Sequence, residues 1–111
     1  MEILIFEDNL IWSVRLKKSI QSLGHEPIVF SKIPENIPEA KIAILNLSMD
    51  SLLLRSLIPK LKEQSIYLVA HAGHKEKEKL EFGKEIGCDQ IVSNGTLTYK
   101  IEKILNQICN I

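Results

Sequence analysis

The chain has 111 residues, 45% of them hydrophobic and 25% charged, which is the balance of an ordinary globular protein. Its 14 lysines and arginines equal its 14 aspartates and glutamates, so no net charge attracts nucleic acid or a membrane surface. No apolar run approaches the roughly 20 residues of a membrane span, and the apolar N-terminal stretch is too short for a signal peptide. We therefore expect one cytoplasmic domain over residues 1–111, with no direct nucleic-acid or membrane partner.

The two cysteines, Cys88 and Cys109, are far apart and lack CxxC spacing. Without a secretory signal, this spacing favours reduced thiols that pack as small hydrophobic side chains.

The first elements are a strand, a helix and a second strand. An apolar run rich in β-branched residues at 2–6 predicts the first strand, and a similar run at 27–30 predicts the second. Between them, Gly24 is placed to end a helix. Four large apolar residues form one stripe of this helix, at spacings of four, four and three: Trp12, Leu16, Ile20 and Leu23.

The connection over residues 31–40 contains Pro34 and Pro38, which leave room for at most one helical turn. A third strand is predicted at 41–45. Residues 48–64 then form an apolar helix in which Pro59 should introduce a kink or cap a second short piece.

The last third of the chain repeats the alternation. A strand at 66–70 precedes a lysine- and glutamate-rich helix over about 74–86, and a strand follows at 90–92. The final helix is predicted to begin near Thr96, a suitable N-cap. Its apolar residues recur at helical spacing: Leu97, Ile101, Ile104, Leu105 and Ile108.

Alternating strands and helices predict an α/β domain, a flavodoxin-like doubly wound (βα)5 fold with a five-stranded parallel sheet and a second helix that is shortened or absent. With strand order 2-1-3-4-5, the ends of the first and third strands are neighbours. Glu7, Asp8 and Asn46 would then meet at the carboxyl edge of the sheet, where such folds bind ligands.

Several stretches resemble the receiver domain of response regulators, of the chemotaxis-type single-domain kind. ILIFEDN at 3–9 is similar to the strand and acidic pair of that family. LVAHA at 68–72 is similar to its fourth strand, and GCDQI at 87–91 to the entry of its fifth strand. The resemblance covers essentially the whole chain and implies a role in two-component signalling.

The resemblance also implies that most of the phosphorylation site has been lost. Asn46 stands where the family has its acceptor aspartate, and Val69 where it has a hydroxyl residue. Asn94 replaces the lysine, with Gly95 in place of the proline that follows, and Ile91 replaces the switch aromatic. An amide has no anionic oxygen to attack phosphorus. We therefore expect no enzymatic activity, but a pseudo-receiver that acts as a protein–protein interaction module without phosphorylation.

The acidic pair is the remaining candidate for a cation site. Glu7 and Asp8 could hold Mg²⁺ or Ca²⁺ only weakly, because two carboxylates leave most of the coordination shell open. We expect no required cofactor. The alternative from another functional class is a flavodoxin-like domain that binds a metal or small ligand through Glu7, Asp8, His71 and His74.

In the receiver family, the face formed by the fourth helix, fifth strand and fifth helix binds signalling partners or a second copy of the domain. The resemblance therefore implies an interaction face, possible in a homodimer as well as with another protein. Its residues in this chain would be Lys75, Lys77, Lys79, Lys84, Ile91, Lys100 and Lys103.

Overall fold

The computed structural model describes residues 1–109, which contain one five-stranded parallel sheet in the order β2-β1-β3-β4-β5. Its strands are β1 (Glu2–Phe6), β2 (Glu26–Phe30), β3 (Ile42–Asn46), β4 (Tyr67–Ala72) and β5 (Gln90–Ser93). The order and the parallel pairing confirm the predicted flavodoxin-like arrangement. Every strand begins and ends within two residues of its predicted position.

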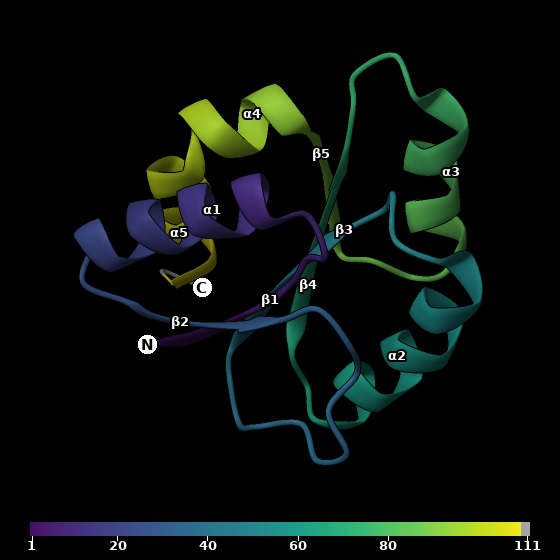
Figure 1. The fold of residues 1–111 in the computed structure, drawn as a ribbon, viewed down its shortest axis with the longest axis horizontal. Helices are drawn as coiled ribbons and strands as arrows, with labels where there is room; N and C mark the ends of the chain where they lie inside the picture. Colours follow the sequence, from purple (N-terminus) through teal and green to yellow (C-terminus); the bar gives the residue numbers. More distant parts are fainter. Residues whose placement is uncertain (110–111) are drawn as a thin grey trace.

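Helices cover both faces of this sheet (Figure 1). On one face lie α1 (Leu10–Ser22), α4 (Asn94–Tyr99) and α5 (Ile101–Cys109). On the other face lie α2 (Ser51–Glu63) and α3 (Lys77–Glu85). The sheet is therefore the middle layer of three, which explains why its central strands are apolar on both sides.

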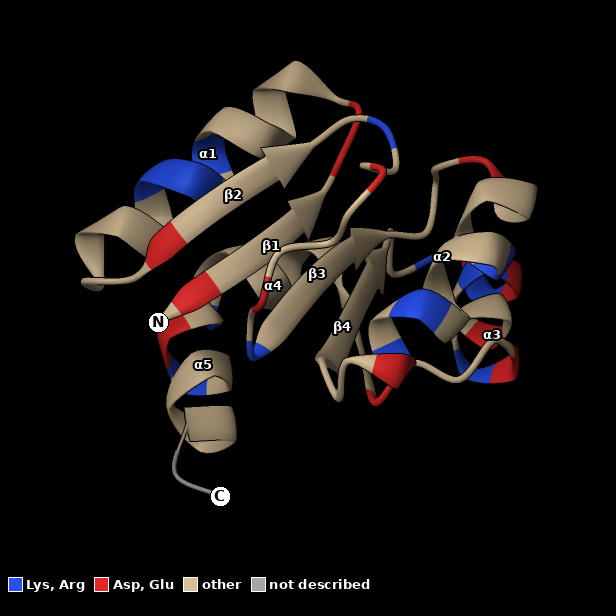
Figure 2. Cartoon of the chain, turned by 90° about the horizontal axis from the view of Figure 1, so that it is seen from below, with Lys and Arg blue, Asp and Glu red and all other residues tan. Residues whose placement is uncertain are grey.

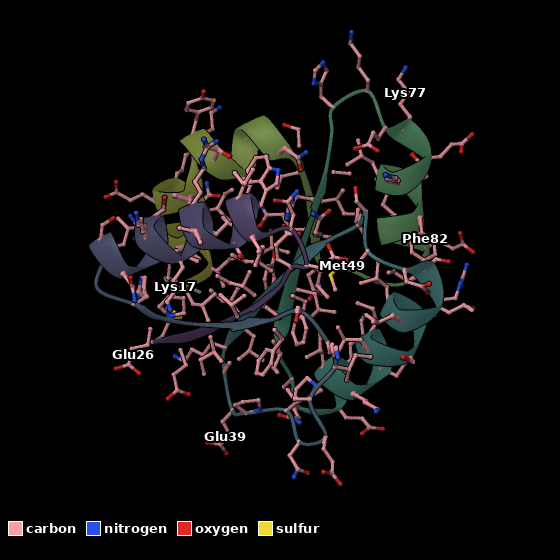
Figure 3. All side chains as sticks on the ribbon, in the orientation of Figure 1. Lys17, Glu26, Glu39, Met49, Lys77 and Phe82 are labelled. Carbon is pink, nitrogen blue, oxygen red and sulfur yellow. The ribbon has the colours of Figure 1, made fainter. Side chains whose placement is uncertain are left out.

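Alternate residues of each central strand enter two separate hydrophobic clusters. In β1, Leu4 and Phe6 pack on the α2–α3 side, whereas Ile3 and Ile5 pack on the α1–α5 side. Figure 3 shows side chains filling both layers. Met49 belongs to the α2–α3 cluster, and the labelled Lys17, Glu26, Glu39 and Lys77 lie at the periphery.

The segment between β2 and β3 forms no helix, as its prolines predicted. It nevertheless contributes to the core, because Ile33, Ile37 and Ala40 pack against the α2–α3 cluster. An irregular segment thus covers the part of the sheet where a regular helix would otherwise be needed.

Two predictions about helix boundaries are corrected. Of the two effects predicted for Pro59, the second short piece does not form, since α2 runs through Pro59 as one helix. The last helix does not begin at Thr96: Ser93 is the N-cap of α4, and its hydroxyl accepts a hydrogen bond from the Thr96 amide at 3.1 Å. Lys100 then separates α4 from α5.

Charged residues are unevenly distributed over the helices. In Figure 2, α3 alternates between lysine and glutamate, whereas α1 carries Arg15, Lys17 and Lys18 and no acidic residue. Within residues 1–109, none of the helices combines the length and apolar character that crossing a bilayer requires.

Candidate functional site

The candidate site lies at the carboxyl edge of the sheet, where β1, β3 and β4 end side by side. Asn46 pairs with His71 across β3 and β4, and Glu7 follows Phe6, the partner of Leu45. Because strand side chains alternate, Glu7, Asn46 and His71 all belong to the α1–α5 side of the sheet. All three are buried, although each is polar.

Glu7 and Asn46 form a closed pair. The Asn46 Nδ2 donates to both carboxylate oxygens of Glu7, at 2.7 Å to Oε2 and 3.0 Å to Oε1. The Asn46 Oδ1 accepts from the Ser48 amide at 2.9 Å, so both ends of the side-chain amide are satisfied. A carboxylate at position 46 could not make the first two bonds, because it has no donor when ionised.

The start of α1 supports the Glu7 carboxylate from a second direction. The Asn9 amide donates to Glu7 Oε2 at 3.2 Å, while the Asn9 side chain caps the helix through the amides of Ile11 and Trp12. Burial raises the pKa of Glu7, and the hydrogen bonds from Asn46 and Asn9 act in the opposite direction.

The acidic pair does not form a shared cation site in this arrangement. Glu7 faces inward and is held by Asn46, whereas Asp8 is exposed. The histidines also separate, because His71 is buried and His74 is exposed. Within the described part of the chain, no three Asp, Glu, His or Cys side chains converge as a metal site would require.

His71 is linked to the start of α4 through Asn94. The Nδ1 of its ring lies 2.7 Å from the Asn94 side-chain amide, and its Nε2 lies 3.8 Å from Glu7 Oε1. The Trp12 ring lies beside the imidazole, with ring centroids 6.1 Å apart. Burial lowers the pKa of His71, which favours the neutral imidazole.

The structure places Val69 elsewhere than the resemblance implied. Val69 pairs with Ile44 inside the sheet and is fully buried in the α1–α5 cluster, so it does not reach this edge. The residue beside Asn46 is His71, which lies one residue beyond the predicted strand at 66–70 and belongs to β4 in the structure. Asn94 does lie at the site, next to His71.

The expected interaction face spans both sides of β5. Ile91 is half-buried, and it packs against the α2–α3 cluster. Lys79 is engaged with Glu76 at 2.6 Å and Ser48 at 3.1 Å, and Lys84 lies 3.5 Å from Glu81.

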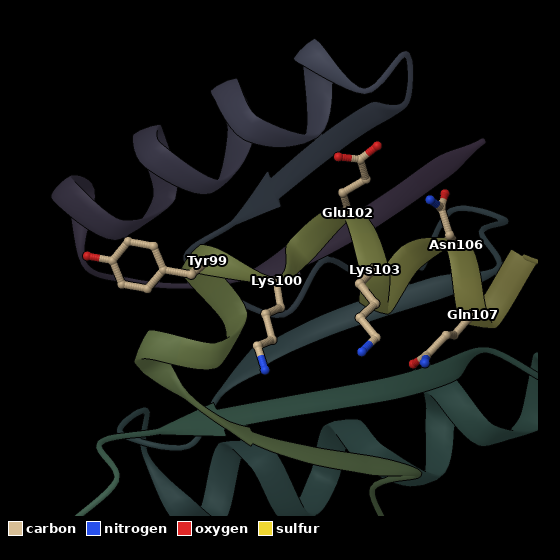
Figure 4. Close-up of a pocket in the computed structure, with 6 residues that line it drawn as sticks. All are labelled: Tyr99, Lys100, Glu102, Lys103, Asn106 and Gln107. Carbon is tan, nitrogen blue, oxygen red and sulfur yellow. The ribbon is translucent and has the colours of Figure 1, made fainter.

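The other lysines of this face are exposed. Lys77 begins α3, and Lys75 lies in the turn just before it. Lys100 and Lys103 line a shallow pocket on α4 and α5 together with Tyr99 (Figure 4). These four cations are therefore free of the ion pairs that engage Lys79 and Lys84 within residues 1–109.

Sequence reasoning missed one surface feature. Leu10, Ile11 and Val14 on the outer side of α1 are exposed, by 79%, 76% and 51%. Their spacing places them along one sector of the helix, which continues into Lys17 and Lys18. The sequence does contain a signal for this surface, because these three apolar residues lie outside the stripe of α1 that was predicted to be buried.

No protein-family model and no curated protein matches the chain, but solved structures do. The chemotaxis response regulator CheY4 of Vibrio cholerae aligns with 96% of this chain and 97% of its own, with a TM-score of 0.76 and 16% identity. A response regulator from Thermotoga maritima aligns with 99% and 98%, with a TM-score of 0.79 and 9% identity.

A third neighbour comes from streptococcal redox sensors described as evolved from two-component response regulators. It has a TM-score of 0.75 and 12% identity, and the alignment covers 96% of this chain but 50% of that one. At such identities the three likenesses establish the receiver fold.

Proposed function

We propose that this domain is a pseudo-receiver: a protein-interaction module of two-component-type signalling that acts without aspartate phosphorylation and without catalysis. The observation that carries the proposal is the Asn46 amide, which donates to both oxygens of Glu7. By the family resemblance, position 46 corresponds to the acceptor aspartate. Hydrogen bonds from Asn46 and Asn9 thus satisfy the central carboxylate of the site from within the domain, which supports a role without a required cation.

The chemistry of the surrounding groups supports this reading. Phosphoryl transfer requires a nucleophilic oxygen and positive charge to stabilise the transferred oxygens. Asn46 supplies no anionic oxygen, and Asn94, which the resemblance aligns with the lysine of the family, carries a neutral amide. The streptococcal neighbour provides a precedent, since its family is described as redox sensors that evolved from two-component response regulators.

The first test is direct. The protein is incubated with acetyl phosphate and excess Mg²⁺ and then analysed by intact-mass spectrometry. No phosphate adduct is expected on the wild type, with a phosphorylatable receiver treated in parallel as the positive control. A stoichiometric, acid-labile adduct would refute the proposal.

We further propose that the interaction face comprises the exposed sides of α3, β5 and α5. Its partner would be another signalling protein, or a second copy of the chain. Long exposed lysines at a rim mainly set association rate and specificity. Charge reversal at Lys77 or Lys103 should therefore slow association with this partner, most strongly at low salt.

A matched control distinguishes this face from α1. Lys18→Glu makes the same charge change beside exposed Ile11 and Val14. If Lys18→Glu slows association while Lys77→Glu and Lys103→Glu do not, the docking surface is the outer side of α1. Sedimentation over a dilution series tests the homodimer separately.

A further inference from the structure

A polar atom in the middle of the site lacks a partner. Within residues 1–109, His71 Nε2 has no hydrogen-bond partner, although the residue is only 1% exposed. This nitrogen is directed at Glu7 Oε1, 3.8 Å away, which is too long for a hydrogen bond and short enough for one to form after a small shift.

The opposite side of the imidazole contacts a group that has two usable orientations. With its oxygen toward the ring, Asn94 places Oδ1 2.7 Å from His71 Nδ1. With the amide rotated, its nitrogen donates to His71 Nδ1 at 2.7 Å and to the Ala72 carbonyl at 3.2 Å, and its oxygen accepts from the Gly73 amide at 3.3 Å.

The rotated orientation suits a neutral imidazole beside an ionised Glu7. In that state Nδ1 is the acceptor, so the ring proton is on Nε2 and points toward the Glu7 carboxylate. Each hydrogen-bond donor then faces an acceptor: Nε2–H faces the Glu7 carboxylate, and the Asn94 amide nitrogen faces His71 Nδ1 and the Ala72 carbonyl.

Adding one proton from solvent reverses this pattern. If the proton stays on the imidazole, both ring nitrogens are donors, and Nδ1–H requires the Asn94 oxygen. If it stays on Glu7, the carboxylic acid donates to Nε2, and the remaining ring proton is on Nδ1, which again requires the Asn94 oxygen. Both places for the proton therefore select the same Asn94 orientation.

We propose that Glu7 and His71 form a buried site for one proton, and that its occupancy sets the orientation of the Asn94 amide at the start of α4. This inference rests on the proposed function, since it assigns a proton as the input of a site that phosphate does not reach. Asn94 connects the site to the helix because it is the first residue of α4, where its backbone carbonyl accepts from the Thr98 hydroxyl at 2.9 Å.

The neighbouring groups favour the rotated orientation in the absence of the added proton. With the oxygen toward the ring, Asn94 Oδ1 lies 3.2 Å from the Ala72 carbonyl oxygen and its nitrogen lies 3.3 Å from the Gly73 amide, so neither contact is a hydrogen bond, although the Gly73 amide keeps its 2.9 Å bond to Glu76. In exchange, the protonated pair gains a charge-assisted contact across the present 3.8 Å gap.

The other charges around the pair come from three elements. Asp8 follows Glu7 and acts on its carboxyl, raising its pKa. The Arg15 guanidinium lies 5.7 Å from the centroid of the Trp12 ring, which flanks His71. From α3, Glu76 is paired with Lys79 and contributes little net charge.

The two groups of the pair shift toward each other. Burial raises the pKa of Glu7 and lowers that of His71. The pair should therefore take up its proton as one coupled step that belongs to both residues.

The test follows ring and amide nitrogens by NMR in the wild-type protein from pH 7.5 to pH 4.5. We expect His71 to change from the Nε2–H form toward a form protonated at Nδ1, with the Asn94 side-chain amide shifting at the same midpoint. Emission of Trp12, the chain's only tryptophan, should change in parallel because its ring lies beside the imidazole.

His71→Gln should abolish the fluorescence titration, and His74→Gln, at an exposed position, is the matched control that should leave it intact. The inference is overturned if the Asn94 amide does not shift with His71 in the wild type, or if the titration persists in His71→Gln. Either result leaves the phosphodonor experiment unaffected, so the proton site and the pseudo-receiver function fail separately.

Discussion

Replacing Asn46 by aspartate tests the closed pair most severely. The change removes two hydrogen bonds of 2.7 and 3.0 Å and puts a second carboxylate against buried Glu7. Two unit charges about 3 Å apart repel by roughly 5 kcal/mol at an effective dielectric constant of 20. Proton uptake by the pair relieves part of this repulsion.

We therefore expect a loss of about 3 kcal/mol at pH 7, within the range for breaking a buried charged contact. For a domain of this size, that loss lowers the melting temperature by roughly 12 °C. The assay is a thermal melt in the presence of a chelator. The matched control is Asn36→Asp, at an exposed position in the segment between β2 and β3.

The pH dependence of Asn46→Asp has a definite sign. The folded carboxylate pair would hold a proton at pH values where the unfolded carboxyls have lost theirs. Stability therefore falls as pH rises through that window, and the deficit should shrink toward pH 5. Mg²⁺ should raise the melting temperature of the variant more than that of the wild type, because it binds the folded acidic cluster. A variant that melts at or above the wild-type temperature in chelator would refute the placement of Asn46 against Glu7.

Two further predictions concern packing and thiol reactivity. A Cβ at Gly83 would lie 2.9 Å from Leu47 Cδ1, so Gly83→Ala should lower the free energy of unfolding by about 1–3 kcal/mol in a denaturant titration. A Cβ at Gly95 would have nothing within 4 Å, so the control Gly95→Ala should change that free energy by at most about 1 kcal/mol. Equal effects of the two would contradict the close packing of α3. Cys88 is partly buried, and burial raises its pKa to about 11, whereas Cys109 is exposed. A thiol reagent at pH 8 should therefore modify Cys109 quickly and Cys88 slowly. Loss of the fast phase in Cys109→Ser identifies the reactive thiol, and a persisting fast phase would disprove the assignment.

Most of the fold could be predicted because its strands are buried on both faces. Runs such as 2–6 and 41–45 are apolar for that reason, and Pro34 and Pro38 excluded a helix from local geometry alone. The capping of α4 was missed because Ser93 and Thr96 are equally good N-caps by type, and only the strand end decides between them.

The site was predicted in part. Glu7 and Asn46 were found because they follow or end apolar runs, whereas Asn94 was found only through the family resemblance. His71 was predicted only as a ligand in the alternative of a metal or small-ligand site, because a polar residue usually marks the end of a buried strand. Its burial depends on Trp12, Asn94 and the sheet register, which are tertiary contacts that no local pattern encodes.

The two ends of the described chain meet at the edge of the sheet remote from the site. Met1 Sδ lies 3.7 Å from Cys109 Sγ, and the N-terminal amine lies 3.2 Å from His25 Nδ1. Fluorophores or carrier proteins attached at these positions would stand away from Glu7 and Asn46. The same proximity makes the domain suitable for circular permutation: a short linker could join the ends, and new ones could be opened in the irregular 31–41 segment. Such a permuted chain would keep the carboxyl edge of the sheet unobstructed for surface immobilisation.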